Sequence, residues 1–107
     1  LGWDATDANL AIYNNDNVST ATRTDLGSNF TVADGRALEV MLSAAPNASS
    51  IEYYVRDITS GSEASGSISS NLPRNNIFIG PQFSMFNGGD AVAMAFDMGA
   101  IYLENEF

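Results

Sequence analysis

The chain contains no cysteine and no histidine, and four arginines are its only cationic side chains. Without cysteine there are no disulfides and no thiolate metal sites. Without histidine there is no Ser-His or Cys-His catalysis and no His-ligated zinc. Any enzyme built on this chain would have to use carboxylates, tyrosine or arginine. We therefore expect no catalytic activity and no cofactor or metal ion.

Positive charge is scarce: thirteen carboxylates against four arginines give a formal net charge of −9. Phosphate backbones are bound through Lys and Arg, so nucleic acid is not an expected partner. The most apolar segment is interrupted by Asp90, Asp97 and Glu104, and it falls short of the roughly 20 apolar residues of a membrane span. Membrane insertion is likewise not expected.

The length and composition suit one small domain with a core of its own, at 107 residues and 45% hydrophobic side chains. The chain starts at Leu1 without an initiator Met, a charged n-region or an apolar h-region. We therefore expect residues 1–107 to be a single β-sandwich domain, or the C-terminal portion of one, taken from a longer polypeptide.

Helix signals are few, whereas β-branched, aromatic and turn residues recur at short spacing. About eight short strands without an amphipathic helix predict an all-β antiparallel sandwich. Residues 59–66 (TSGSEASG) are predicted to be a polar loop. The shorter strands are expected at residues 9–14, 18–25, 30–32, 67–69, 77–79 and 82–86.

Two stretches alternate with period two, residues 36–44 (RALEVMLSA) and 49–58 (SSIEYYVRDI). In the first, Leu38, Val40 and Leu42 share one face, which predicts a strand with that face in the core. The turn signal Ala45-Pro46-Asn47 lies between the two stretches. Together they predict an antiparallel hairpin.

The segment that follows Asn87-Gly88-Gly89 is the most apolar in the chain. Val92, Met94, Phe96 and Met98 fall on one face, and after Gly99 the phase shifts to Ile101 and Leu103. A one-residue shift of this kind is typical of a β-bulge. We predict one long closing strand with a bulge at Gly99-Ala100.

Several short motifs follow one another in a recognisable order: Ile51–Val55 (IEYYV), Asn71–Pro73 (NLP), Gly80–Gln82 (GPQ), Asn87–Gly89 (NGG) and Tyr102–Glu104 (YLE). Over residues 37–107 the chain resembles the second half of concanavalin-A-like jelly-roll domains of bacteriophage tail-fibre and other virion surface proteins. The resemblance implies a jelly-roll of the lectin and glucanase type, of which this chain is the C-terminal part.

The same resemblance implies a structural and binding module of a virion surface protein, such as a fibre, tail or capsid decoration. Its implied partners are other virion subunits, as a homotrimer or another homo-oligomer, and host-surface glycans. The implied location is the virion surface. Two alternatives remain open: a free-standing carbohydrate-binding module of a secreted bacterial protein, and a jelly-roll glycan hydrolase or lyase.

For carbohydrate binding, the residues implicated are Trp3, Phe83, Phe86 and Asn87. Trp3 stands among small and acidic residues, where an exposed indole can stack on a sugar ring. The resembled family often has Trp in the strand after GPQ, where this chain has Phe83 and Phe86. Packing in a core or an interface is the competing interpretation of all three aromatic side chains.

Two groups of carboxylates invite other chemistry. Asp4, Asp7, Asp16 and Asp25 supply oxygen ligands of the kind calcium prefers, but they lack EF-hand spacing, so solvated turns are expected. Glu39 and Glu52 lie on strands predicted to face each other, as an acid–base pair would in a glycosidase. No dense cluster of carboxylates on one strand supports that activity.

Overall fold

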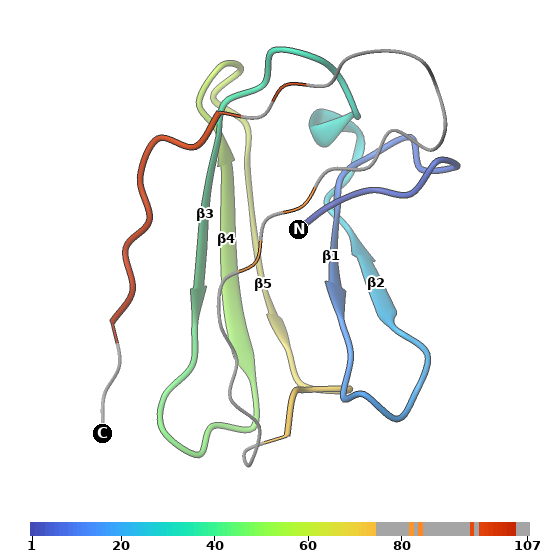
Figure 1. Ribbon diagram of the computed structural model, residues 1–107, viewed down its shortest axis with the longest axis vertical. Helices are drawn as coiled ribbons and strands as arrows, with labels where there is room; N and C mark the ends of the chain where they lie inside the picture. The colour runs from blue at the N-terminus through green and yellow to red at the C-terminus, as the bar shows by residue number, and fades with distance from the viewer. Residues whose placement is uncertain (75–81, 83, 85–94, 96, 105–107) are drawn as a thin grey trace. The chain divides into compact units, whose positions relative to one another are not determined.

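A computed structural model describes residues 1–74, 82, 84, 95 and 97–104 (Figure 1). The chain divides into two compact units, Leu1–Ile77 and Phe78–Phe107. Every strand described belongs to the first unit. In the part of the chain that is described, no helix is long and apolar enough to cross a membrane.

The first unit is built from two antiparallel sheets and one short 3-10 helix, η1. One sheet is the hairpin β1–β2, and the other has the order β3–β4–β5. The sequence prediction of an all-β, antiparallel fold is confirmed at this level. The elements are β1 (Ala11–Asn14), β2 (Thr22–Asp25), η1 (Ser28–Phe30), β3 (Leu38–Ser43), β4 (Ile51–Asp57) and β5 (Glu63–Ile68).

The predicted hairpin of two alternating strands is confirmed as β3 and β4, which pair with Val40 opposite Val55. The turn between them closes where the Ala48 N–H donates to the Ala45 carbonyl at 3.0 Å. Asn47 takes a positive φ of 56° in this turn. Asparagine tolerates that left-handed conformation better than most residues, which explains its place after Pro46.

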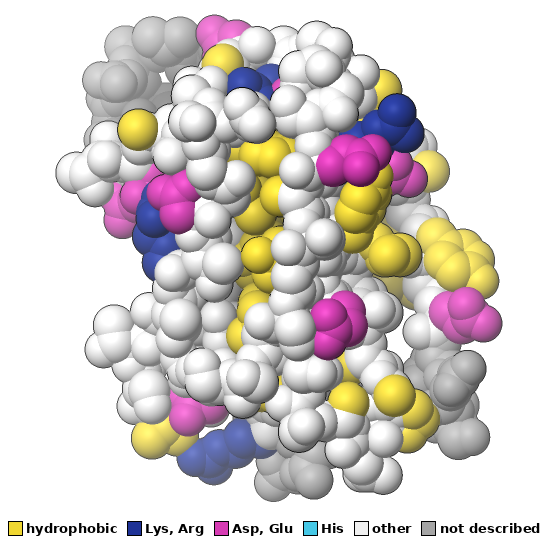
Figure 2. All heavy atoms as spheres, turned by 180° about the vertical axis from the view of Figure 1, so that it is seen from behind, with side chains coloured by type: hydrophobic (Ala, Val, Ile, Leu, Met, Phe, Trp, Pro, Cys, Tyr) yellow, Lys and Arg dark blue, Asp and Glu magenta, His cyan; other side chains and the backbone are white. Residues whose placement is uncertain are grey.

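A small apolar core lies between the two sheets. Leu10 lies directly before β1 and Ile12 lies on β1, in the sheet formed by β1 and β2, which we call the first sheet. Val55 comes from β4, Ile68 from β5 and Phe30 from η1. Phe30 and Val55 are almost completely buried. Figure 2 shows apolar side chains in a strip between surfaces that are otherwise polar. An apolar core shared by two antiparallel sheets gives the first unit a β-sandwich-like character.

The prediction for the face of β3 is wrong. Leu38 packs against the core, but Val40 is 44% and Leu42 is 59% exposed. β3 is the end strand of its sheet, on the side away from β1 and β2 in Figure 1. The buried residues of the core come from β1, β4, β5, η1 and Leu10, and of β3 only Leu38 packs against them. Period two identified the strand, but not whether a second layer covers it.

The predicted loop at 59–66 is confirmed only as far as Ser62, because β5 begins at Glu63 and pairs along β4. Gly66 lies directly opposite Tyr53, and a Cβ atom at Gly66 would come within 2.6 Å of the Tyr53 hydroxyl oxygen. The tyrosine ring thus covers the glycine across the strands, which offsets the low strand propensity of a Ser- and Gly-rich segment.

Two further strand predictions are corrected near the first hairpin. Phe30 ends η1 instead of starting a strand, and Thr31 makes only a single bridge to Asn9. The strand expected at 18–25 begins only at Thr22. The reason is local: the Asp16 carboxylate accepts the N–H groups of Val18 and Ser19 at 2.9 and 2.8 Å and closes a turn there.

Asn71 joins the two sheets at one end. Its side-chain nitrogen donates to the Thr20 carbonyl at 2.9 Å, and its side-chain oxygen accepts the Asp16 N–H at 3.0 Å. The side-chain nitrogen of Asn14 in turn donates hydrogen bonds to the carbonyl groups of Ser70 and Asn71. The turn of the β1–β2 hairpin is therefore held to the segment after β5.

Asp57 is the one charged side chain with almost no solvent exposure among the described residues. It pairs with Arg36, which also donates to the Asn29 carbonyl at 3.1 Å and to the Thr31 hydroxyl at 3.0 Å. This buried ion pair joins the segment before β3, the η1 region and the end of β4. A buried charge is tolerated when it is paired and hydrogen-bonded in this way.

The long, bulged closing strand is not found where it can be examined. Asp97–Glu104 forms no strand, so there is no ladder in which Gly99-Ala100 could be a bulge. Ile101 and Leu103, expected to be covered, are 47% and 70% exposed. Alternation makes a strand only where a neighbour supplies a ladder. The rest of that prediction, and the strands expected at 77–79 and 82–86, involve residues outside the described set.

Candidate functional site

Only one of the four residues predicted to bind carbohydrate falls in the described structure. Trp3 is described, and its side chain is 50% exposed. Phe83, Phe86 and Asn87 lie outside the described residues. The site is therefore built from Trp3 and from what surrounds it.

Trp3 is held in place by backbone pairing on one side and a turn on the other. Gly2 and Ala11 exchange backbone hydrogen bonds of 3.0 and 2.9 Å, which fix the start of the chain against β1. Directly after Trp3, the Asp7 N–H donates to the Asp4 carbonyl at 2.9 Å. An indole on so well-anchored a backbone is presented to solvent at low conformational cost.

A polar cluster, which we call the Asp7–Arg23 cluster, is hydrogen-bonded to the backbone directly after Trp3. Its members are Asp7, Asn9, Tyr13, Arg23 and Asp25. Arg23 bridges the two carboxylates: its Nε lies 3.0 Å from Asp7 Oδ1 and its Nη2 lies 3.0 Å from Asp25 Oδ2. The Tyr13 hydroxyl donates to Asp7 Oδ2, and Asn9 Nδ2 donates to Asp25 Oδ1 at 3.1 Å.

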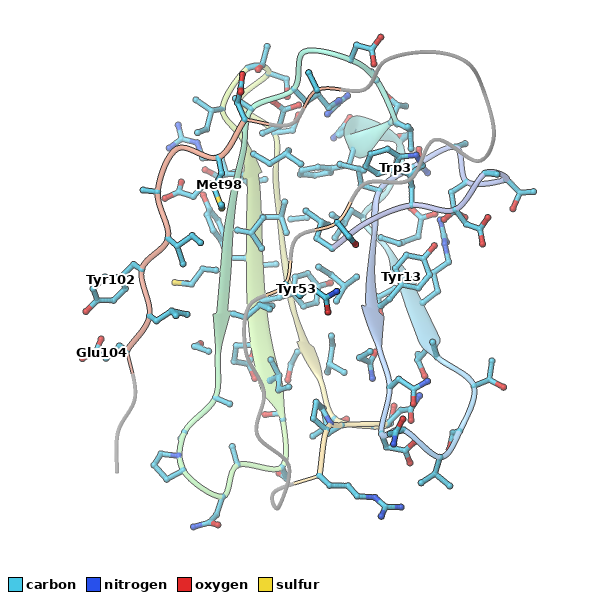
Figure 3. The ribbon with its side chains drawn as sticks, viewed as in Figure 1. Trp3, Tyr13, Tyr53, Met98, Tyr102 and Glu104 are labelled. Atoms are coloured by element: carbon cyan, nitrogen blue, oxygen red, sulfur yellow. The ribbon has the colours of Figure 1, made fainter. Side chains whose placement is uncertain are left out.

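Trp3 is connected to this cluster through a single peptide unit. The Asp4 N–H, which follows the Trp3 carbonyl, donates to Asp7 Oδ2 at 2.9 Å. Figure 3 shows Trp3 and Tyr13 on the β1–β2 side of the first unit, while Tyr53 comes from β4. The Asp7 carboxylate thus fixes the tyrosine, the arginine and the backbone after the tryptophan at once.

The hydrogen bonds of the Asp7–Arg23 cluster change the pKa values of its ionisable side chains. The Tyr13 hydroxyl and then the Asp4 N–H lower the pKa of Asp7, and the same hydroxyl bond raises the pKa of Tyr13. The Gly27 N–H, followed by Arg23, lowers the pKa of Asp25. At neutral pH the carboxylates are therefore ionised and Tyr13 is protonated, which is the state in which these bonds form.

The cluster retains hydrogen-bonding capacity at its surface. Arg23 and Asp25 have side chains 33% and 40% exposed. Within the described structure, Asn9 Oδ1 accepts no hydrogen bond from the protein, and the guanidinium of Arg23 is partly exposed to solvent. These groups can donate to and accept from ligand hydroxyls. An exposed aromatic ring together with such groups suits a ligand with both an apolar face and many hydroxyls.

The structure gives the acidic residues uses other than metal binding. Arg23 already occupies the space between Asp7 and Asp25, and Asp16 caps a turn. In the residues that the structure describes, no group of three or more potential ligands could hold a metal ion. The expectation of solvated turns holds for Asp16, but it misses the ion pairs of Asp7 and Asp25.

Glu39 and Glu52 do not form the acid–base pair considered from the sequence. Glu39 lies opposite Arg56 in the β3–β4 ladder, and Glu52 lies opposite Ser43. Four residue pairs separate them, or about 13 Å along the strands. This exceeds the roughly 5–9 Å between the carboxyl groups of glycosidases. Glu52 instead accepts a hydrogen bond from Ser67 at 2.7 Å.

The sequence carries one signal for the Asp7–Arg23 cluster, in the pairing of its first two predicted strands. Residues 9–14 and 18–25 were both expected to be strands around an Asn-rich turn. Pairing them as a hairpin places Tyr13 opposite Arg23, which is the observed register. Asp25, two residues along β2, then lies on the same face as Arg23.

Comparisons of the chain with models of known protein families, with curated proteins and with solved structures found no match.

Proposed function

We propose that this chain is a glycan-binding and assembly module, forming part of a concanavalin-A-like jelly-roll domain of a phage virion surface protein. Its task is attachment to host-surface glycans from a fibre, tail or capsid decoration built with other subunits. The observation that carries the binding role is the half-exposed Trp3, whose neighbour Asp4 is hydrogen-bonded through its N–H to the Asp7–Arg23 cluster. The virion setting rests on the sequence resemblance alone.

The chemistry of this site suits a sugar. The indole face of Trp3 stacks on the C–H face of a pyranose ring, while Arg23 and Asn9 reach its hydroxyls. Because Arg23 is held by Asp7 and Asp25, its orientation is fixed before the ligand arrives. Such preorganisation reduces the entropy lost on binding.

The jelly-roll part of the proposal needs more than the five strands described. A jelly roll has about eight strands in two sheets, connected as Greek keys. Within each observed sheet, neighbouring strands follow one another in sequence, and the chain passes from one sheet to the other through η1. In the proposed jelly roll, the remaining strands come from sequence outside the described residues or from neighbouring chains.

The test uses the fact that Trp3 is the only tryptophan. Screening on a glycan array is followed by titration of the best glycan while indole fluorescence is recorded. We expect an emission change on binding and a loss of about tenfold or more in affinity for Trp3→Ala, the scale of one aromatic contact.

The matched control is Val18→Ala, since Val18 is 68% exposed and lies in the turn between β1 and β2. This variant should bind as the unaltered protein does. A protein that binds no glycan on the array, or a Trp3→Ala variant with unchanged affinity, would remove the basis of the proposed site.

A further inference from the structure

The outer edge of β3 is unlike the other strand edges that the structure describes. Val40, Met41 and Leu42 are 44, 56 and 59% exposed, and Glu39 is the only charged residue of the strand. β2 is lined by the ion pair of Arg23 and Asp25, and β5 carries small side chains and Glu63. Protected edges usually carry Lys, Pro or a bulge, and β3 has none of these within its six residues.

The hydrogen bonds around β3 show which of its backbone groups point outward. The Ile58 N–H donates to the Ala37 carbonyl at 2.8 Å, in line with the β3–β4 register. Antiparallel pairs alternate between hydrogen-bonded and non-hydrogen-bonded positions. Glu39 and Met41 therefore bond to β4. The residues that turn their N–H and C=O groups to the outer edge are Leu38, Val40 and Leu42.

We infer that this edge pairs with the same edge of a second copy of the chain, antiparallel and about a two-fold axis at Val40. The inference deepens the assembly part of the proposed function by naming the partner and the contact. A two-fold axis normal to an antiparallel pair maps hydrogen-bonded pairs onto hydrogen-bonded pairs. The residue at the centre must therefore lie opposite its own equivalent.

The sequence of the strand fits this register. With Val40 at the centre, Leu38 lies opposite the second copy's Leu42, so apolar residues meet at each outward-bonding position. Glu39 lies opposite the second copy's Met41, and no two carboxylates face each other directly. Cross-strand pairs of this kind stabilise a sheet, whereas like charges directly opposite weaken it.

Charge also selects this edge for contact between copies. Two chains of net charge −9 repel each other, and the repulsion is smallest where each contributes least charge. β3 combines a single carboxylate with exposed apolar side chains. A two-fold contact here joins the three-stranded sheets of two copies into one continuous sheet.

The first experiment measures mass in native solution with the full chain at up to about 100 µM, which saturates an interaction of micromolar Kd. We expect twice the monomer mass of 11.4 kDa. Val40→Lys should give a monomer, and Val18→Lys, the same change at an exposed position away from β3, should remain a dimer. Far-UV circular dichroism checks that both variants fold.

The second experiment uses the absence of cysteine from the chain. Val40→Cys should form a disulfide between copies under mild oxidation, because Cα atoms of a hydrogen-bonded pair lie about 5.5 Å apart. Ser65→Cys, exposed on β5, is the matched control and should stay reduced.

A monomer at every concentration, a trimer, or a dimer in which Val40→Cys does not cross-link overturns the inference. Glycan binding by Trp3 is measured separately and does not depend on β3. Failure of the dimer therefore leaves the proposed binding role standing, and failure of glycan binding leaves the dimer.

Discussion

Single residues decide how the first unit holds together, and the buried pair of Asp57 and Arg36 is the strongest example. The Asp57 carboxylate accepts the N–H groups of Thr59 and Ser60 at 2.8 and 3.1 Å as well as the guanidinium. Burial raises the pKa of Asp57, but these bonds and Arg36 lower it by more, so the net shift is downward. The group stays ionised inside the fold.

Removing this carboxylate should be costly. Asp57→Ala leaves Arg36 without its charge partner and two N–H groups without an acceptor, so we expect Tm to fall by more than about 10 °C. Glu63→Gln is the matched control, because the Arg56–Glu63 pair is about half exposed with its atoms 3.7 Å apart. Its change should stay below about 0.5 kcal/mol. Similar losses of Tm for the two variants would contradict the structural role given to Asp57.

At the scale of elements, the sequence predicts strands correctly where the side chains of a single stretch alternate with period two. β3 and β4, with their turn, were predicted to within two residues. β5 was predicted only at its end, as a strand at 67–69, because its earlier part is stabilised by Tyr53 lying across Gly66, and no property of residues 63–68 alone reveals that neighbour. The closing strand failed for the converse reason: it had the pattern, but over residues 97–104 it has no ladder.

The candidate site could be predicted only in part. The residue type and the setting of Trp3 were sufficient to select it. The Asp7–Arg23 cluster was not predicted, because it depends on the register that places Tyr13 opposite Arg23. That register becomes visible only when two short, weakly patterned stretches are paired with each other.

The β1–β2 hairpin should show its ion pairs as a dependence of stability on pH. Asp7 and Asp25 have folded-state pKa values below that of an ordinary aspartate, so the unfolded state binds protons first as pH falls. Stability is then fully present above about pH 5 and is lost as pH falls through the folded-state pKa values. Tyr13, whose pKa is raised, acts in the opposite sense above about pH 10.

Urea denaturation at a series of pH values checks this. Asp7→Asn should lower stability at neutral pH and flatten the decline between about pH 5 and pH 3. Tyr13→Phe should lower stability at neutral pH. It should also abolish the part of the stability loss above about pH 10 that comes from ionisation of Tyr13. Asp34→Asn, in the exposed turn before β3, is the control and should follow the unaltered protein. An acid decline of unchanged slope in Asp7→Asn would show that the cluster does not stabilise the fold.

At the scale of the whole molecule, the two sheets of the first unit share one small core, so neither can lose it alone. Ile12 lies on the first sheet and Ile68 on the second, and both belong to the same buried cluster. Ile12→Val and Ile68→Val should each lower the free energy of unfolding by about 1 kcal/mol, the usual loss for one buried methyl group. Val18→Ala, in an exposed turn, should change it little.

Because both sheets share this buried apolar cluster, Ile12→Val and Ile68→Val should each shift a single cooperative urea transition. The shift should be the same whether unfolding is followed by circular dichroism or by Trp3 fluorescence. Trp3 reports from the side of the first sheet, while circular dichroism averages over all strands. If Ile68→Val moved the circular dichroism transition and left the Trp3 transition in place, the sheets would be separate folding units. Coincident shifts are expected, since Leu10 and Ile12 from the side of the first sheet and Val55 and Ile68 from the second belong to one buried cluster.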